Sequence, residues 1–148
     1  MIRARSGIML SIEDKKKELV KYFEKKSNII AVWIVGSYGT EYQREDSDVD
    51  FAIIFDGDVD LMDELRIGTE ITDIIKNENV DIINLKESSL SLQYNAVSDG
   101  TTLYERDFIQ VSDYIENIYR LYFINKYYID SYNRDYLYSG YKRGAVKV

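Results

Sequence analysis

The chain has 148 residues, 26 acidic against 19 basic side chains, a formal net charge of −7, and no histidine, cysteine or proline. Its length and its 45% apolar content predict one domain over residues 1–148, with a core over about 11–107 and a tyrosine-rich helical segment over about 108–140. The missing residue types exclude disulfides, zinc–thiolate sites, thiol nucleophiles and histidine bases. Catalysis would therefore depend on carboxylates, hydroxyls, lysine, arginine and a metal ion that prefers oxygen ligands.

Charge and hydropathy also limit the partners that we expect. Direct nucleic-acid binding is disfavoured by the acidic balance, because such binding needs a basic surface to displace phosphate counterions. No segment approaches the roughly 18 consecutive apolar residues of a membrane-spanning helix. The first ten residues carry two arginines, but their apolar part is too short for a signal peptide. We therefore expect a soluble, cytoplasmic protein that does not use a membrane.

The first predicted elements are a helix and two strands. A capping-box pattern beginning at Ser11 predicts a helix over about Ile12–Lys26. The apolar run Ile29–Val35 predicts a strand that is buried on both faces. A polar stretch with two glycines, residues 36–47, predicts a turn, and Val49–Phe55 predicts the second strand.

The second half of the chain predicts helices that alternate with short strands. The predicted elements are a helix over Asp60–Lys76, a strand over Val80–Leu85, a helix over Leu90–Val97 capped by Ser88, a short extended piece at Thr101–Tyr104, and a final helix from Asp107 to about Tyr138. This order predicts an α/β (α+β) fold in which a small mixed sheet is flanked by helices and followed by a C-terminal helical extension.

Three acidic residues are the candidates for catalysis. Asp48 and Asp50 are two positions apart at the start of a strand, so their side chains would point to one face. Two carboxylates held that close repel each other unless a cation lies between them, and Mg²⁺ prefers such oxygen ligands. Asp81 begins the next strand in a run that looks buried, where an unused carboxylate would be costly. If the second and third strands are neighbours, the three acids form a two-metal site.

A glycine–serine pair precedes these acids by a short spacer. Gly36 and Ser37 follow a buried strand, and ten residues separate Ser37 from Asp48. Glycine lets the backbone approach a ligand closely, and the amides and hydroxyl that follow can bind phosphate oxygens. Combined with the acids, this turn predicts a site for a nucleoside triphosphate with metal-assisted chemistry.

Each of these signals alone has an ordinary structural explanation. Gly-Ser is common in turns, Asp48 and Asp50 could be a solvated strand end, and Asp81 could cap an element or pair with a lysine. Their order along the chain favours the functional interpretation over these three.

At these residues the sequence resembles the nucleotidyltransferase superfamily with the polymerase-beta-like fold. The resemblance rests on Gly36-Ser37, the ten-residue spacer and Asp48-Val49-Asp50-Phe51, and it covers roughly Ile29–Asp107. The short length resembles the minimal nucleotidyltransferase (MNT) branch, which includes the MntA-type adenylyltransferase antitoxins that are paired with HEPN toxins. The segment after Asp81, together with Gly100–Asp107, is similar to the end of MNT proteins.

The resemblance implies a role for each matching residue. Asp48, Asp50 and Asp81 would bind the metal, with two Mg²⁺ ions expected, and Asp81 would help to activate the attacking hydroxyl. Gly36 and Ser37 would bind the phosphates of ATP, with Ser47 beside them. Where the family often has a small residue, a basic residue and a glycine, this chain has Gly39, Thr40 and Glu41, which leaves Arg44 as the candidate basic contact.

The tyrosine-rich segment points to a partner. Ten of the 14 tyrosines lie between Tyr104 and Tyr141. This pattern fits helix packing with an amphipathic surface, and it also fits an interface with a toxin or with a second copy; stacking on RNA is disfavoured by the charge. The resemblance implies that the partner is a HEPN ribonuclease, and a chain without histidine cannot itself be that toxin.

We therefore expect an antitoxin that transfers AMP from ATP to a hydroxyl, in the resemblance a tyrosine, of its HEPN partner. Two alternatives are a nucleotidyltransferase for small molecules of the aminoglycoside type and a non-catalytic antitoxin that blocks its partner sterically.

Overall fold

The structure is a computed structural model that describes residues 14–35 and 49–138, with the side chains of residues 136–138 left out. A helix over residues 14–24 comes first, and its Leu19 and Phe23 are fully buried. Ser11, the predicted cap of this helix, lies outside the described residues.

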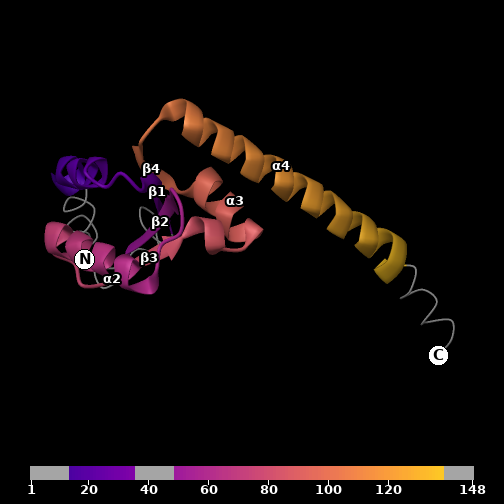
Figure 1. Ribbon diagram of the computed structural model, residues 1–148. Helices are drawn as coiled ribbons and strands as arrows, with labels where there is room; N and C mark the ends of the chain where they lie inside the picture. The colour runs from indigo at the N-terminus through magenta and orange to yellow at the C-terminus, as the bar shows by residue number, and fades with distance from the viewer. Residues whose placement is uncertain (1–13, 36–48, 139–148) are drawn as a thin grey trace.

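The later elements follow the predicted order. They are β1 (Ile29–Val35), β2 (Val49–Phe55), α2 (Leu61–Ile75), β3 (Val80–Asn84), the short 3₁₀ helix η1 (Leu85–Glu87), α3 (Leu90–Asp99), β4 (Thr101–Glu105), α4 (Phe108–Tyr132) and the π-helical turn η2 (Asn133–Tyr138). Figure 1 shows their arrangement.

The four strands form one mixed sheet in the order β3-β2-β1-β4. β1 is antiparallel to both β2 and β4, whereas β2 and β3 are parallel and are connected through α2. β1 and β2 are therefore the central strands, which explains their nearly continuous apolar sequences. The small mixed sheet flanked by helices confirms the predicted fold class.

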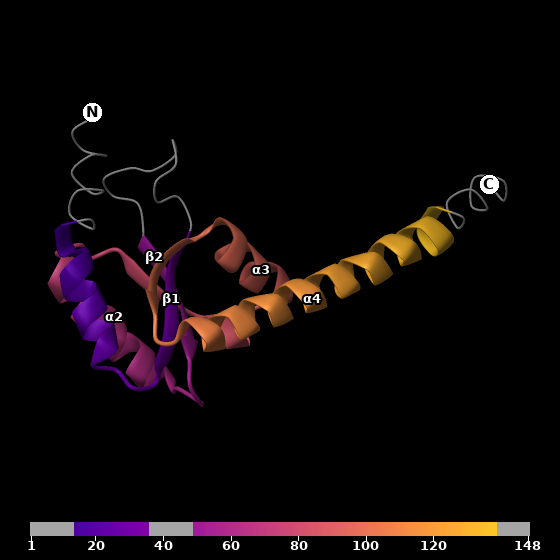
Figure 2. The ribbon, with the colours of Figure 1, turned by 90° about the horizontal axis from the view of Figure 1, so that it is seen from above.

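Helices cover both faces of the sheet, and each face has its own apolar core. The helix over residues 14–24 and α2 cover one face, while α3 and the first part of α4 cover the other (Figure 2). Phe51 and Phe55 of β2 belong to the first core, and Ala52 and Ile54 of the same strand belong to the second. Alternate residues of β2 thus point to opposite cores, as the two-residue period of a strand requires.

Polar side chains set the starts of the helices. The side chain of Asp60 accepts a hydrogen bond from the backbone N–H of Asp63, and Asp107 does the same for Gln110 at the start of α4. The predicted cap of α3 was wrong by one residue: the cap is Ser89, because Ser88 is used at the end of η1, where its hydroxyl donates to the carbonyl oxygen of Asn84.

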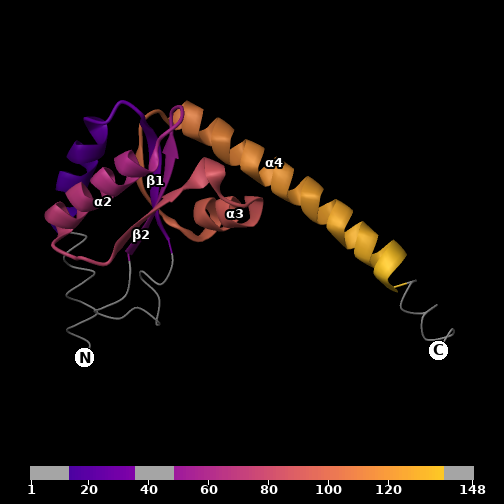
Figure 3. The same ribbon diagram turned by 60° about the horizontal axis from the view of Figure 1, so that its bottom comes forward.

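α4 reaches well beyond the sheet. In Figures 1 and 3 its C-terminal half extends away from all the other described elements. Only Val111 and Ile118 of its 25 residues are buried, and both lie in the first half. None of the helices in the described parts of the chain is long and apolar enough to cross a membrane.

Candidate functional site

Two of the predicted acids lie side by side at one end of the sheet. Asp50 on β2 and Asp81 on β3 are register partners on neighbouring parallel strands. Adjacent strands are about 4.8 Å apart, and residues paired in register point to the same face. The second and third strands are therefore neighbours, which is the condition on which the expected grouping of these two acids depended.

The carboxylates lie on the face of the sheet that α3 covers. Ala52 and Ile54, which share a face with Asp50, belong to the core that also contains Ala96 of α3. On the other side of Asp50, its register partner is Val35, the last residue of β1. β1 and β2 are antiparallel, and β2 and β3 are parallel. One end of the sheet therefore contains the last residue of β1 and the first residues of β2 and β3.

A backbone hydrogen bond to the residue before β3 holds the first residue of β2 in place. The backbone N–H of Val49 donates to the carbonyl oxygen of Asn79 at 2.7 Å, which continues the β2–β3 pairing beyond the strand. Asp50 is half-buried, and Asp81 is exposed. The position of the two acids is therefore set by backbone pairing on both sides of β2.

The exposure of Asp81 corrects one prediction. The run Val80–Leu85 was expected to be buried, with a costly carboxylate inside it. β3 is instead an edge strand, so that its outer side is open and Asp81 reaches solvent. A carboxylate there needs no partner to offset desolvation, and its placement beside Asp50 is what indicates a function.

The remaining predicted site residues cannot be placed. Those outside the described residues are Gly36, Ser37, Arg44, Ser47 and Asp48. Asp48 directly precedes Val49, the first residue of β2, and the 36–48 segment connects the two strand ends that meet at this edge. The phosphate-binding role of the glycine–serine turn remains a prediction.

The chemistry of the Asp50–Asp81 pair suits a hard divalent cation. Two carboxylates on one face, at neighbouring strand positions, supply the oxygen ligands that Mg²⁺ prefers. Within residues 14–35 and 49–138, which lack Asp48, no group of three acidic side chains is close enough to hold a metal ion. Asp48, the third acid that the sequence predicts, lies outside these residues.

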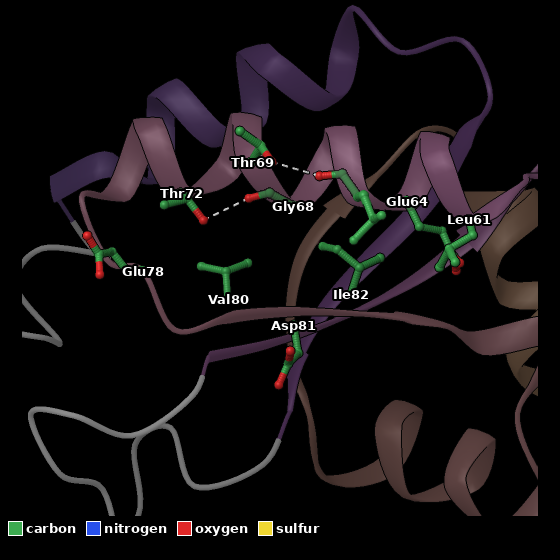
Figure 4. A pocket seen from close by; sticks show the side chains of 10 residues that line it. Leu61, Glu64, Gly68, Thr69, Thr72, Glu78, Val80, Asp81 and Ile82 are labelled. Carbon is green, nitrogen blue, oxygen red and sulfur yellow. Dashed lines mark hydrogen bonds between the residues drawn. The ribbon is translucent and has the colours of Figure 1, made fainter.

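A pocket that the sequence did not predict lies across β3 from this pair, on the side of α2. It has a volume of about 370 Å³ and is bordered by α2 and by residues 78–82. In Figure 4 the side chains of Val80 and Ile82 point towards α2, while Asp81 points away from it on the other side of the strand. Gly68 faces Ile82 across the pocket, and a Cβ at Gly68 would lie 3.5 Å from the Cγ1 of Ile82.

One ionisable group in the pocket is perturbed. Burial raises the pKa of the Glu64 carboxyl, and the negative charge of Glu87 raises it further. Glu64 is on the first turn of α2, near the end of β3 that is opposite to Asp81. The perturbation therefore reflects the packing at that end of the pocket and does not involve the carboxylate pair.

Three solved structures with a similar fold are toxin–antitoxin complexes. A toxin–antitoxin structure with AMP-PNP has a TM-score of 0.67 at 16% identity, covering 82% of this chain and 98% of that chain. The MntA–HepT toxin–antitoxin has a TM-score of 0.64 at 13% identity, covering 84% and 98%. A tri-AMPylated HEPN toxin from Shewanella oneidensis in complex with its MNT antitoxin has a TM-score of 0.64 at 15% identity, with the same coverage.

These identities show a shared fold, and the sequence match shows the family. A comparison with curated protein sequences found no match. Residues 17–109 match the family described as Polymerase beta, Nucleotidyltransferase, and this range contains the whole sheet and both carboxylates. The chain therefore belongs to the polymerase beta nucleotidyltransferase family.

Proposed function

We propose that this protein is a Mg²⁺-dependent adenylyltransferase that transfers AMP from ATP to a hydroxyl, in our proposal that of a tyrosine, on a HEPN toxin partner. The observation that carries the proposal is the in-register pairing of Asp50 with Asp81 at the edge of a sheet of the nucleotidyltransferase family. The similar folds of toxin–antitoxin complexes, one with AMP-PNP and one with an AMPylated toxin, support the choice of nucleotide and partner.

In this proposal the three carboxylates bind the metal, and the residues of the preceding turn bind the nucleotide. Asp48, Asp50 and Asp81 hold the metal, and bound Mg²⁺ supplies charge stabilisation to the phosphate oxygens. Gly36 and Ser37 bind the terminal phosphates, with Ser47 and Arg44 as further contacts. The backbone pairing of β2 with β3 fixes two of the carboxylates before the substrate arrives, and such preorganisation is a large part of phosphoryl-transfer catalysis.

Asp81 acts on the acceptor. Its carboxylate takes the proton of the acceptor hydroxyl while the oxygen attacks the α-phosphorus and pyrophosphate leaves. Because Asp81 is exposed on an edge strand, a hydroxyl on the surface of another protein can approach it without a rearrangement of the sheet. This accessibility favours a macromolecular acceptor over a small molecule enclosed in a deep site.

The test is a transfer assay with the full chain. Purified protein is incubated with α-labelled ATP, Mg²⁺ and the protein encoded by the neighbouring gene, and label on that protein is measured by gel and mass spectrometry. We expect transfer that depends on Mg²⁺ and falls by at least about a hundredfold in Asp50→Asn and in Asp81→Asn, the scale of losing an electrostatic catalytic group.

Asp58→Asn is the matched control. Asp58 is an exposed carboxylate just after the other end of β2, so this variant removes the same charge away from the pair. We expect its transfer rate to remain within about twofold of the parent, the scale of a surface charge change. A stable complex that forms without transfer would contradict catalysis and support steric inhibition, and transfer to an aminoglycoside alone would contradict the protein acceptor.

A further inference from the structure

One side of α4 carries a row of six exposed residues, which we call the α4 seam. The seam consists of Glu116, Arg120, Phe123, Tyr127, Asp130 and Arg134, the last of these on η2. Their spacing alternates between four and three residues, which places them on one side of a helix in the manner of a coiled-coil seam. The two aromatic residues at its centre are 52% and 65% exposed.

The charges of the seam have few partners within one chain. Glu116 and Asp130 form no side-chain ion pair within the described residues. Arg120 donates to Asn117 at 2.6 Å, and Arg134 makes a 3.5 Å ion pair with its exposed neighbour Asp135. Four charged groups are therefore available for contacts with another molecule, since an exposed pair such as Arg134–Asp135 contributes little and is readily exchanged.

The sequence of side chains along the seam is complementary to the same sequence read in the opposite direction. Glu116 and Arg134 are each nine residues from position 125, Arg120 and Asp130 are each five residues from it, and Phe123 and Tyr127 are each two residues from it. In an antiparallel pair of α4 helices centred on position 125, glutamate therefore meets arginine, arginine meets aspartate, and phenylalanine meets tyrosine. Every pair occurs twice, which is the property of a two-fold symmetric interface.

We propose that two copies of this chain associate through antiparallel α4 helices along this seam. A partner of different sequence would need complementarity to the seam but no symmetry within it, so the symmetry favours a second copy. Ile124 is exposed beside the seam and adds apolar surface on one side. The seam spans about 27 Å of helix, at 1.5 Å per residue, which is long enough for a stable pairing of several turns.

The fold leaves room for this arrangement. The antiparallel pairing puts the sheet domain of each copy beside the far end of the other copy's α4. In Figures 1 and 3 that end of α4 stands clear of the sheet and of the other helices. Phe123 touches Tyr94 of α3 with ring centroids 5.6 Å apart, so the ring that would meet the partner's tyrosine is already oriented.

Charge reversal tests the pairing in the full-length chain. We expect a dimer by sedimentation velocity at micromolar concentration. Arg120→Glu turns both symmetry-related pairs with Asp130 into repulsions, and we expect it to raise the dissociation constant about tenfold. Adding Asp130→Arg restores opposite charges, so the double variant returns to within about threefold of the parent. Circular dichroism checks that every variant remains folded.

Asn125→Glu is the control because Asn125 is exposed on α4 and lies about 160° around the helix from both Phe123 and Tyr127, opposite to the seam. We expect its dissociation constant to stay within about threefold of the parent. A parent chain that is monomeric throughout the concentration series would overturn the proposal. So would equal weakening by Arg120→Glu and Asn125→Glu, or a double variant that is not restored.

Cysteine pairing tests the direction of the helices, since the chain has no cysteine of its own. A mixture of Glu116→Cys and Arg134→Cys should form disulfide-linked dimers under mild oxidation, whereas each variant alone should not. Linkage by each variant alone, without linkage in excess in the mixture, would show parallel helices and overturn the antiparallel arrangement.

Discussion

The ring of Tyr94 on α3 lies flat against the ring of Tyr122 on α4, with centroids 3.9 Å apart and planes 6° from parallel. Tyr119 and Phe123 meet the same ring edge-on, at 5.5 and 5.6 Å. Tyr94 is thus held by three aromatic residues of α4, just before the point where this helix leaves the domain.

We expect Tyr94→Ala to lower the free energy of unfolding by about 2 kcal/mol, since it removes stacking and leaves a gap between the two helices. Hydrogen exchange should increase in α4 around Tyr119–Phe123. Tyr94→Phe keeps the ring and should cost under about 0.5 kcal/mol. Equal losses in the two variants would contradict the role of the ring.

Arg106 links three other segments of the chain at the opposite end of the sheet. Its guanidinium donates to the carbonyl oxygen of Ser27 at 2.8 Å, to the side chain of Gln110 at 2.9 Å and to the carboxylate of Asp56 at 3.2 Å. Lysine has a single ammonium and cannot reproduce this fork of donors. We expect Arg106→Lys to cost about 1–2 kcal/mol in urea unfolding. Arg66→Lys, at an exposed 3.5 Å pair with Asp63, should change stability by less than about 0.5 kcal/mol.

Gly100 is needed because there is no room for a side chain. A Cβ there would overlap the carbonyl oxygen of Ala96 and lie 3.0 Å from the Cγ1 of Val35, next to the end of β1. We expect Gly100→Ala to lower the free energy of unfolding by about 1–3 kcal/mol, as overpacking does. Chemical denaturation measures the change.

Gly68 provides the opposite case on α2. A Cβ at this position would be 3.5 Å from the Cγ1 of Ile82, an ordinary contact. Because glycine is unfavourable inside a helix, Gly68→Ala should stabilise the protein by about 0.5–1 kcal/mol. A loss of stability in Gly68→Ala that matches the loss in Gly100→Ala would show that space does not distinguish the two sites.

Glu64 predicts a pH dependence of stability. Burial and the charge of Glu87 raise its pKa in the folded state, so the folded protein holds this proton more tightly than the unfolded chain. Protonated Glu64 therefore favours the folded state relative to ionised Glu64. This contribution to stability is fully present below the unfolded pKa, about 4.3, and is lost as the pH rises through the folded pKa. Glu64→Gln should therefore be more stable than the parent at neutral pH, by about half a kcal/mol, and should lose this advantage below about pH 4. Thermal unfolding at several pH values checks this, and an advantage that persists in acid would contradict it.

The central strands and the start of α4 could be predicted from the sequence. Ile29–Val35 and Val49–Phe55 match β1 and β2 to the residue, because both are buried on two faces and only apolar residues fit there. Asp107 was correctly expected to begin α4, since a cap leaves a local signature. The family resemblance, carried by the glycine–serine pair and the acids, is likewise confirmed by the match over residues 17–109.

The features that the sequence analysis predicted wrongly or missed depend on tertiary contacts. The apolar residues of β3 face α2 on one side only, so the sequence of an edge strand looked like that of a buried one and Asp81 was expected inside. The pocket between α2 and β3 arises from the way the helix lies across the strand, which no local pattern encodes. The roles of Gly36, Ser37, Arg44, Ser47 and Asp48 remain predictions.

The carboxylate pair of Asp50 and Asp81 is joined by main-chain hydrogen bonds and not by flexible side chains or a loop. The distance between the two carboxylates is therefore set by the pairing of the strands and does not change gradually when the protein is destabilised. Substitutions in either core should change how many molecules are folded while leaving each folded molecule equally competent. In a population of destabilised variants, the transfer activity that we propose should then follow the folded fraction in direct proportion. If Mg²⁺ binds as proposed, an excess of it should recover activity by shifting unfolded chains to the native state.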